Sequence, residues 1–152
     1  MMQNCLFGEQ NVCPTGSTDN CCQTRTGFWE AYDTNYRTQL EADLRNCTAS
    51  CANPNECLVL TGHSQGGSAA QIAAVVLQDL NPQVITFGNE RTLNAECPHL
   101  NATRWARYAN TRVGLWGGLE YDLWPFQYFD RGLVNFGYTL LVTDDTTGVA
   151  NI

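Results

Sequence analysis

The sequence is short of positive charge. Its 152 residues contain 8 Lys and Arg against 15 Asp and Glu, which gives a formal net charge of −7 at pH 7. Nucleic-acid binding needs a surface that neutralises phosphates, and the basic residues here nowhere form a run. We therefore expect no nucleic acid among the partners of this protein.

The sequence also lacks a long apolar run and a visible leader. No apolar stretch approaches the roughly 18 residues that a membrane-spanning helix requires, so we expect no transmembrane segment. Residues 1–7 have neither the positively charged residues nor the continuous apolar stretch of a signal peptide, so no secretory signal peptide is visible. The length is typical of one domain, and 43% hydrophobic residues are enough for a buried core.

Cysteine, by contrast, is abundant, with 8 residues. An even number without the CxxC spacing of zinc ligands favours disulfides, so we expect disulfide bonds and no metal. Two acceptor patterns for N-glycosylation, Asn46-Cys47-Thr48 and Asn101-Ala102-Thr103, also favour an oxidising lumen or exterior. We expect a secreted glycoprotein or one of the secretory-pathway lumen, and a chain that begins downstream of the true start of its protein.

The chain divides into a short first part and a longer second part. Residues 1–24 carry four of the cysteines among small polar residues, which predicts an irregular, cross-linked segment without a core strand. Residues 25–152 are expected to form the main domain. It begins with an amphipathic helix over residues 28–46, because apolar residues recur every four positions. We expect this stripe to face the core; it consists of Phe28, Tyr32, Tyr36, Leu40 and Leu44.

A strand, a helix and a second strand follow. Residues 58–60 form a short apolar run typical of a strand buried on both faces, residues 67–80 a small-residue helix, and residues 83–87 another strand. This order predicts a parallel pair with a right-handed crossover. Residues 105–109 and 138–143 predict further strands, with a long loop between them. The expected fold class is therefore α/β, with a mostly parallel sheet and flanking helices.

The segment Gly62-His63-Ser64-Gln65-Gly66 matches G-x-S-x-G. Between a buried strand and a helix, this pattern places the serine on a sharp, strained turn, and the glycines leave room for the strand and the helix to approach. The hydroxyl then points out of the end of the sheet, where the N–H of Gln65 is an oxyanion donor. Ser64 is the candidate nucleophile, and an ordinary strand-to-helix turn is the alternative.

Several segments together resemble the class 3 lipases, the fungal-lipase-like branch of the α/β-hydrolases, over about residues 26–149. Leu58 to Gly67 is close to the family's L-x-V-T-G-H-S-L-G-G, and residues 87–94 resemble F-G-x-P-R-x-G-N, with Glu90 for Pro and Leu93 for Gly. Residues 107–110 resemble the strand that leads to the acid. The resemblance implies a partial α/β-hydrolase fold and hydrolysis of acyl esters such as triacylglycerols, in lipid metabolism.

The resemblance also implies an acid in a D-x-V-P stretch. Asp122 and Pro125 have that spacing, with Trp124 in place of Val. Asp122 is therefore the candidate acid, whose role would be to hold an imidazole in one tautomer and to stabilise its protonated form. Asp130 is the alternative, and a solvated loop carboxylate is the simplest interpretation of either residue.

The base is the departure from the family. The histidine of an H-x-G segment is expected where Asn135 stands, and a shift of three residues puts Tyr138 there. Neither side chain is a base near neutral pH, because an amide does not titrate and a phenol has a pKa near 10. His63 is expected to pack beneath the turn. His99 is the alternative base, and it reaches the serine only if its loop folds back.

A second oxyanion donor is also missing. Class 3 lipases take it from a loop upstream of the segment that resembles residues 26–46, and residues 1–24 show no such strand. Losing one donor costs about 3 kcal/mol of transition-state stabilisation. We therefore expect inefficient turnover by this chain alone, with its early strands missing.

Three hypotheses follow. The first is a serine ester hydrolase that needs no cofactor and binds an acyl chain or a lipid surface; the aromatic residues that would contact the lipid are Trp116, Trp124, Phe126 and Phe129. The second is a non-catalytic, lipase-like domain that binds lipid or protein. The third is an incomplete gene product that never folds stably, because a sheet without its early strands keeps an unpaired edge.

Overall fold

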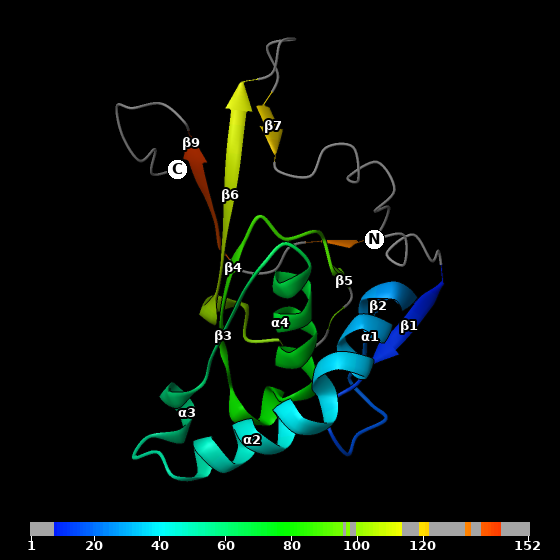
Figure 1. The fold of residues 1–152 in the computed structure, drawn as a ribbon, viewed down its shortest axis with the longest axis vertical. Helices are drawn as coiled ribbons and strands as arrows, with labels where there is room; N and C mark the ends of the chain where they lie inside the picture. The colour runs from blue at the N-terminus through cyan, green and yellow to red at the C-terminus, as the bar shows by residue number, and fades with distance from the viewer. Residues whose placement is uncertain are drawn as a thin grey trace.

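The computed structural model describes residues 8–95, 97, 100–113, 119–121, 133–134 and 138–143. These residues form two β-sheets with helices against them (Figure 1). The first half contains β1 (Glu9–Val12), β2 (Cys22–Arg25), α1 (Thr26–Tyr32), η2 (Asp33–Arg37), α2 (Thr38–Ala49), α3 (Pro54–Cys57) and β3 (Val59–His63). The second half contains α4 (Gln65–Val76), η3 (Gln78–Leu80), β4 (Gln83–Phe87), β5 (Leu93–Asn94), η4 (Ala102–Arg104), β6 (Trp105–Val113), β7 (Leu119–Tyr121), β8 (Leu133–Val134) and β9 (Tyr138–Thr143).

The larger sheet is mostly parallel. Strand β3 pairs with β4, β4 with β6, and β6 with β9, each in parallel, while β7 pairs antiparallel with the far end of β6. The predicted strand–helix–strand unit is therefore present as β3, α4 and β4. This arrangement confirms the α/β fold class, with a sheet flanked by helices.

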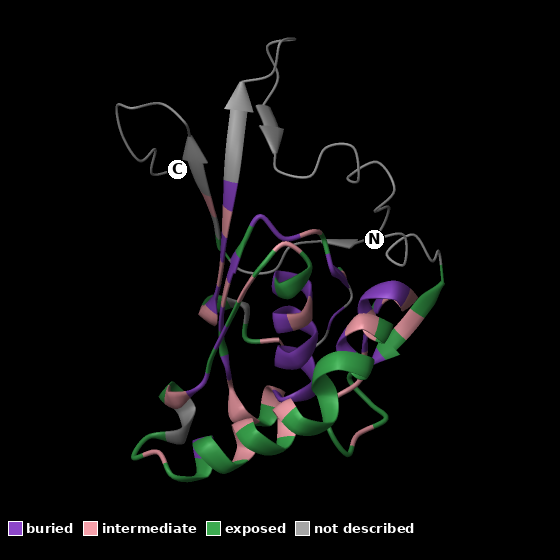
Figure 2. Cartoon of the chain, viewed as in Figure 1, coloured by how far each residue is buried: buried purple, intermediate pink, exposed green. Residues whose placement is uncertain are grey.

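The core lies between this sheet and α4. Nearly all of α4 is buried, whereas much of α2 is exposed (Figure 2). From the sheet, Leu60, Val84 and Trp105 face the helix, and each is less than 9% exposed. Burial of each aliphatic side chain contributes about 1.5–3 kcal/mol, so this contact holds α4 against the sheet. Among the described residues, no helix combines the length and the apolar character needed to cross a membrane.

The opposite face of the same sheet is open in the described residues. The strand registers align its side chains in rows: Val59 and Gln83; Thr61, Ile85, Ala106 and Tyr138; His63, Phe87, Tyr108 and Leu140. Val59 is 48% exposed, Phe87 43% and Tyr138 66%. The expectation that residues 58–60 are buried on both faces is therefore wrong for Val59. A parallel sheet normally has both faces covered, and here the described part of the chain covers one.

A smaller antiparallel sheet is built from the N-terminal residues. Strands β1 and β2 form a hairpin in which Glu9 lies opposite Arg25, and β2 continues to β5 and β8. The prediction of an irregular segment is thus wrong for these strands. Their polar sequences show no apolar alternation, so the pairing is set by contacts that a local pattern does not reveal.

Three disulfides form among the described residues, as expected from the cysteine content. Cys13–Cys21 closes the hairpin loop, Cys22–Cys97 ties β2 to the segment after β5, and Cys51–Cys57 closes the segment that contains α3. Cys47 is a free, exposed thiol. Cys5 lies outside the described residues.

The predicted first helix is present as a continuous helical stretch from α1 through η2 to α2. Phe28 and Tyr32 are buried, as expected, but Tyr36 is 48% exposed. A step of four residues advances about 40° beyond a full α-helical turn, so a four-residue stripe drifts out of the core. The wider π-helical turn of η2 also interrupts the α-helical register there. The expectation that the whole stripe is core is therefore wrong at Tyr36.

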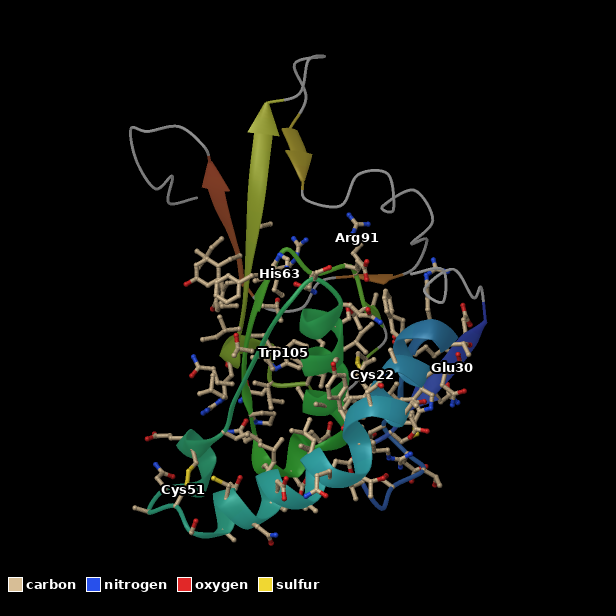
Figure 3. All side chains as sticks on the ribbon, viewed as in Figure 1. Cys22, Glu30, Cys51, His63, Arg91 and Trp105 are labelled. Carbon is tan, nitrogen blue, oxygen red and sulfur yellow. A yellow bond between two sulfur atoms is a disulfide. The ribbon has the colours of Figure 1, made fainter. Side chains whose placement is uncertain are left out.

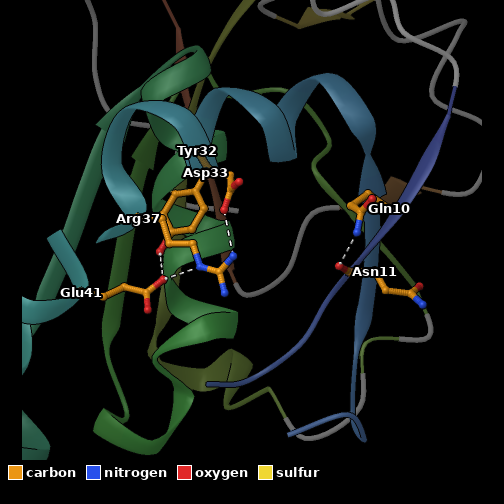
Figure 4. Close-up of polar contacts among 6 residues, drawn as sticks. All are labelled: Gln10, Asn11, Tyr32, Asp33, Arg37 and Glu41. Carbon is orange, nitrogen blue, oxygen red and sulfur yellow. Dashed lines mark hydrogen bonds and ion pairs between the residues drawn. The ribbon is translucent and has the colours of Figure 1, made fainter. Parts of the chain in front are cut away.

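A small polar network spans this π-helical turn (Figure 4). The Tyr32 hydroxyl donates to Oε1 of Glu41 at 3.0 Å, and the Arg37 guanidinium donates to Oδ1 of Asp33 at 2.8 Å. Arg37 also lies over the ring of Trp29, 5.2 Å from its centroid. Burial, together with the negative charge of Glu41, raises the pKa of Tyr32. The network thus connects α1 to α2 across η2.

We predict that Tyr32→Phe lowers the free energy of unfolding by about 1.5 kcal/mol at pH 7, because it removes this hydrogen bond to a carboxylate. The difference in stability between the wild type and the variant should shrink as the pH rises above about 10. There the unfolded tyrosine ionises, whereas folded Tyr32, with its raised pKa, stays protonated. The wild type therefore loses stability that Tyr32→Phe does not have to lose. Urea unfolding of both proteins at pH 7 and at a pH above about 10 measures this effect. The exposed Tyr36→Phe is the control, and a deficit independent of pH would contradict the prediction.

Candidate functional site

The turn between β3 and α4 has an unusual backbone at Ser64. Its φ of 52° and ψ of −126° place a non-glycine residue in a region that costs about 1–3 kcal/mol. Two neighbours hold it there: the Ser64 N–H donates to the carbonyl of Phe87 at 3.0 Å, and the Ser64 carbonyl accepts from the N–H of Gly67 at 2.9 Å. The strained residue is therefore fixed between β4 and the first turn of α4.

Two glycines make this turn sterically feasible. A Cβ built on Gly62 would overlap the carbonyl of Gly66 and lie 2.6 Å from the nitrogen of Gly67. A Cβ on Gly67 would lie 2.6 Å from the Cβ of Asn89. A Cβ on Gly66 would have nothing within 4 Å, so the expectation that this second glycine of the motif also leaves room for the approach is wrong. Position 62 thus has no room for a side chain because β3 lies against α4, and position 67 has none because Asn89, in the loop after β4, lies against the helix.

The first residues of α4 give the turn a partial positive charge. The helix begins at Gln65, so the N–H of Gln65 lies at the positive end of the helix dipole, next to Ser64. Ser64 is half-buried, and Gln65 and Gly66 are exposed. This arrangement can offer a hydroxyl and, beside it, backbone N–H groups to an ester carbonyl.

A buried polar network supports the loop after β4, beneath the turn. The Arg107 guanidinium donates to the carbonyl of Asn89 at 2.9 Å, and the Thr86 hydroxyl donates to Oδ1 of Asn89 at 2.6 Å. The Thr92 hydroxyl donates to that of Ser68 at 2.9 Å, which ties the loop to α4. Sequence reasoning did not find these positioning contacts, although Arg107 falls in a segment that resembles the family.

The predicted site residues are only partly within the described chain. Ser64 and Gln65 lie together at the turn, whereas His99, Asp122 and Asn135 lie outside the described residues. The alternative acid Asp130 and the aromatic residues expected to contact lipid also lie outside them; these are Trp116, Trp124, Phe126 and Phe129. The triad assignments therefore stay predictions.

The other two candidates for the base position lie on the open face of the sheet. His63 is exposed at the end of β3, so the expectation that it packs beneath the turn is wrong (Figure 3). The alternation of side chains along a strand puts His63 on the same face as Val59 and Thr61. Tyr138 is exposed at the start of β9 on that same face.

A pocket of about 240 Å³ lies away from Ser64, at the opposite end of α4. Its lining includes Pro14, Gln78, Asn81 and Asn101. A helix of 12 residues spans roughly 18 Å, so this pocket does not belong to the site at Ser64. Within the described ranges, no group of three or more His, Cys, Asp or Glu side chains is arranged to hold a metal ion.

Comparison with known proteins identifies what the chain is similar to. Residues 4–112 match a family described as lipase (class 3). Lipase II from Rhizopus niveus is 20% identical, with a TM-score of 0.58 over 90% of this chain and 49% of that chain. MDLA from Penicillium cyclopium is 21% identical, with a TM-score of 0.62 over 94% of this chain and 50% of that chain.

A third solved structure, a lipase from Rhizopus microsporus var. chinensis, is 19% identical, with a TM-score of 0.57 over 88% of this chain and 45% of that chain. The chain therefore spans about half the length of the solved structures that it matches. No curated protein matches it. At these identities the likeness shows the fold.

We predict that Gly62→Ala lowers the free energy of unfolding by about 3 kcal/mol, because the new Cβ forces β3 away from α4. Gly66→Ala is the matched control: it meets open space, and it should raise stability by about 0.5 kcal/mol through helix propensity. Urea unfolding monitored by tryptophan fluorescence measures both. Equal effects of the two substitutions would contradict the close approach at position 62.

Proposed function

The chain belongs to the class 3 lipase family, and from that premise we propose that it is a serine ester hydrolase with Ser64 as its nucleophile. The observation that carries the proposal is the backbone of Ser64, whose φ is 52° between a parallel strand and a helix N-terminus. The substrate class is an acyl ester of lipid type, such as a triacylglycerol, and the biological context is lipid metabolism.

The chemistry uses the chain's own groups and needs no cofactor. The Ser64 hydroxyl oxygen attacks the ester carbonyl carbon while its proton passes to a base. The N–H of Gln65 stabilises the resulting oxyanion, aided by the positive end of α4. Collapse of the intermediate expels the alcohol and leaves an acyl-serine, which water hydrolyses to regenerate Ser64.

The base is where this chain departs from the family. We assign the acid role to Asp122, and Asn135 occupies the position at which the resemblance expects a histidine. An amide has no titrating nitrogen, and a positioned general base typically contributes about 10²–10⁴ in rate. His99 is the alternative base. The proposal therefore includes slow turnover, limited by proton removal from Ser64.

The compartment in which the protein resides is part of the same proposal. Three disulfides require an oxidising environment to form and persist. Together with the two glycosylation patterns, they support a glycoprotein that is secreted or resides in the lumen of the secretory pathway.

A second candidate function is a non-catalytic domain that binds a lipid surface. It is favoured by the open face of the larger sheet, where Val59, Phe87 and Tyr138 are between 43% and 66% exposed. None of the ten side chains in the three rows on this face is Lys, Arg, Asp or Glu, although the whole chain carries a formal net charge of −7. An exposed face of this kind, without Lys, Arg, Asp or Glu, suits contact with an apolar partner.

We predict that the purified chain hydrolyses a short-chain p-nitrophenyl ester slowly and that Ser64→Ala reduces the rate to that of buffer. Asn135→His should increase the rate by about 10²-fold or more by supplying a base, and the double variant with Ser64→Ala should lose that gain. Ser17→Ala, in the exposed hairpin loop, is the control. Hydrolysis that survives in Ser64→Ala would remove Ser64 from the mechanism.

For the binding function, we predict that the chain floats with neutral phosphatidylcholine vesicles in a density gradient and that Tyr138→Lys weakens this association at least about tenfold, because it places a charge on the open face. Tyr36→Lys introduces the same charge at a residue that is 48% exposed on η2, and it should leave flotation unchanged. Flotation without any Ser64-dependent hydrolysis would favour the binding function over the hydrolase.

A further inference from the structure

We propose that Asn101, and not Asn46, is the N-glycosylation site of this protein. The inference rests on the proposed passage through the secretory pathway. Both residues begin an acceptor pattern, but the structure presents the two patterns in very different ways. One begins just before the short 3-10 helix η4, with Asn101 and Thr103 both exposed, and the other lies inside α2, with Thr48 buried.

The reaction sets what the acceptor must offer. The amide nitrogen of the asparagine bonds to C1 of an oligosaccharide carried on a lipid pyrophosphate, the bond from C1 to the pyrophosphate oxygen breaks, and the amide loses one proton. The acceptor pattern also requires a Ser or Thr hydroxyl two residues later. An enzyme that reads both groups must therefore reach both side chains from one side.

The Asn101 pattern meets this requirement. Asn101 and Thr103 are both exposed, and the Thr103 hydroxyl donates to Oδ1 of Asn101 at 2.6 Å. The N–H of Arg104 donates to the carbonyl of Asn101 at 3.0 Å, which closes the single turn of the 3-10 helix η4. The turn brings the amide and the hydroxyl together at the surface.

There is also room for a sugar attached to Asn101. The Asn101 amide nitrogen donates to Oδ1 of Asn81 at 3.2 Å. A glycosylated amide keeps one N–H, so this contact can persist after modification. The pocket of about 240 Å³ at the end of α4 is lined in part by Asn101 and Asn81, so the first sugar has open space beside it.

The Asn46 pattern fails the same requirement. It lies within α2, where residues two apart point about 200° from each other and do not share a face. Thr48 is 4% exposed, and its hydroxyl is already used, donating to the carbonyl of Leu44 at 2.6 Å. Several side-chain hydrogen bonds of this helical stretch join residues four apart, so these do not wait for distant parts of the chain. In the folded protein the Asn46 pattern is presented as helix.

The test is expression of the full chain behind a signal peptide in a eukaryotic host, followed by intact mass measurement before and after an endoglycosidase that releases N-glycans. We expect one glycan on the wild type. Asn101→Gln and Thr103→Ala should abolish it, while Asn46→Gln and the conservative Thr103→Ser should retain it.

Three results would overturn the proposal: a secreted wild type without a glycan, a glycan on both asparagines, or a glycan that survives Asn101→Gln and is lost in Asn46→Gln. Ester hydrolysis is measured separately on the unglycosylated chain. The glycosylation proposal and the hydrolase proposal can therefore fail independently.

Discussion

The close approach of β3 to α4 is the constraint on which the rest of the site depends. Gly62 meets the backbone of Gly66 and Gly67 with no space for a Cβ, and between these close segments the backbone passes through Ser64 with a φ of 52°. The hydrogen bond from Ser64 to Phe87 then ties the same turn to β4. One steric requirement thus places the hydroxyl, the start of the helix and the end of the sheet at one point.

The same sheet has two very different faces. The face toward α4 is a packed core that ends in a polar network around Asn89 and Arg107, which supports the loop beneath the turn. The other face presents Phe87 stacked on Tyr108, with ring centroids 5.0 Å apart, and no Lys, Arg, Asp or Glu in its three rows. Ser64 lies where these two faces meet the end of the sheet, so the strained turn lies beside the exposed face on which the proposed binding function rests.

Much of the fold around Ser64 could be predicted from the sequence. Glycines flank the serine, an apolar run precedes it and small apolar residues follow it, and these local patterns are enough to predict a strand, a turn and a helix. The same reasoning failed at Val59 and Tyr36, because local periodicity shows which side chains share a face and not whether another element covers that face. It also did not find Asn89 as a support, since nothing local distinguishes a buried asparagine from one in a solvated loop.

What the sequence alone determined, therefore, is the strand–turn–helix unit with its strained serine, the parallel order of its strands and the use of disulfides. Tertiary structure decided the rest: the hairpin of β1 and β2, the pairing of Cys22 with Cys97, and which glycosylation pattern exposes both of its side chains. The physical reason is distance along the chain. The N–H of Gln23 finds Oδ1 of Asn94 across 71 residues, and Cys22 finds Cys97 across 75; such contacts leave no periodic signal near either partner.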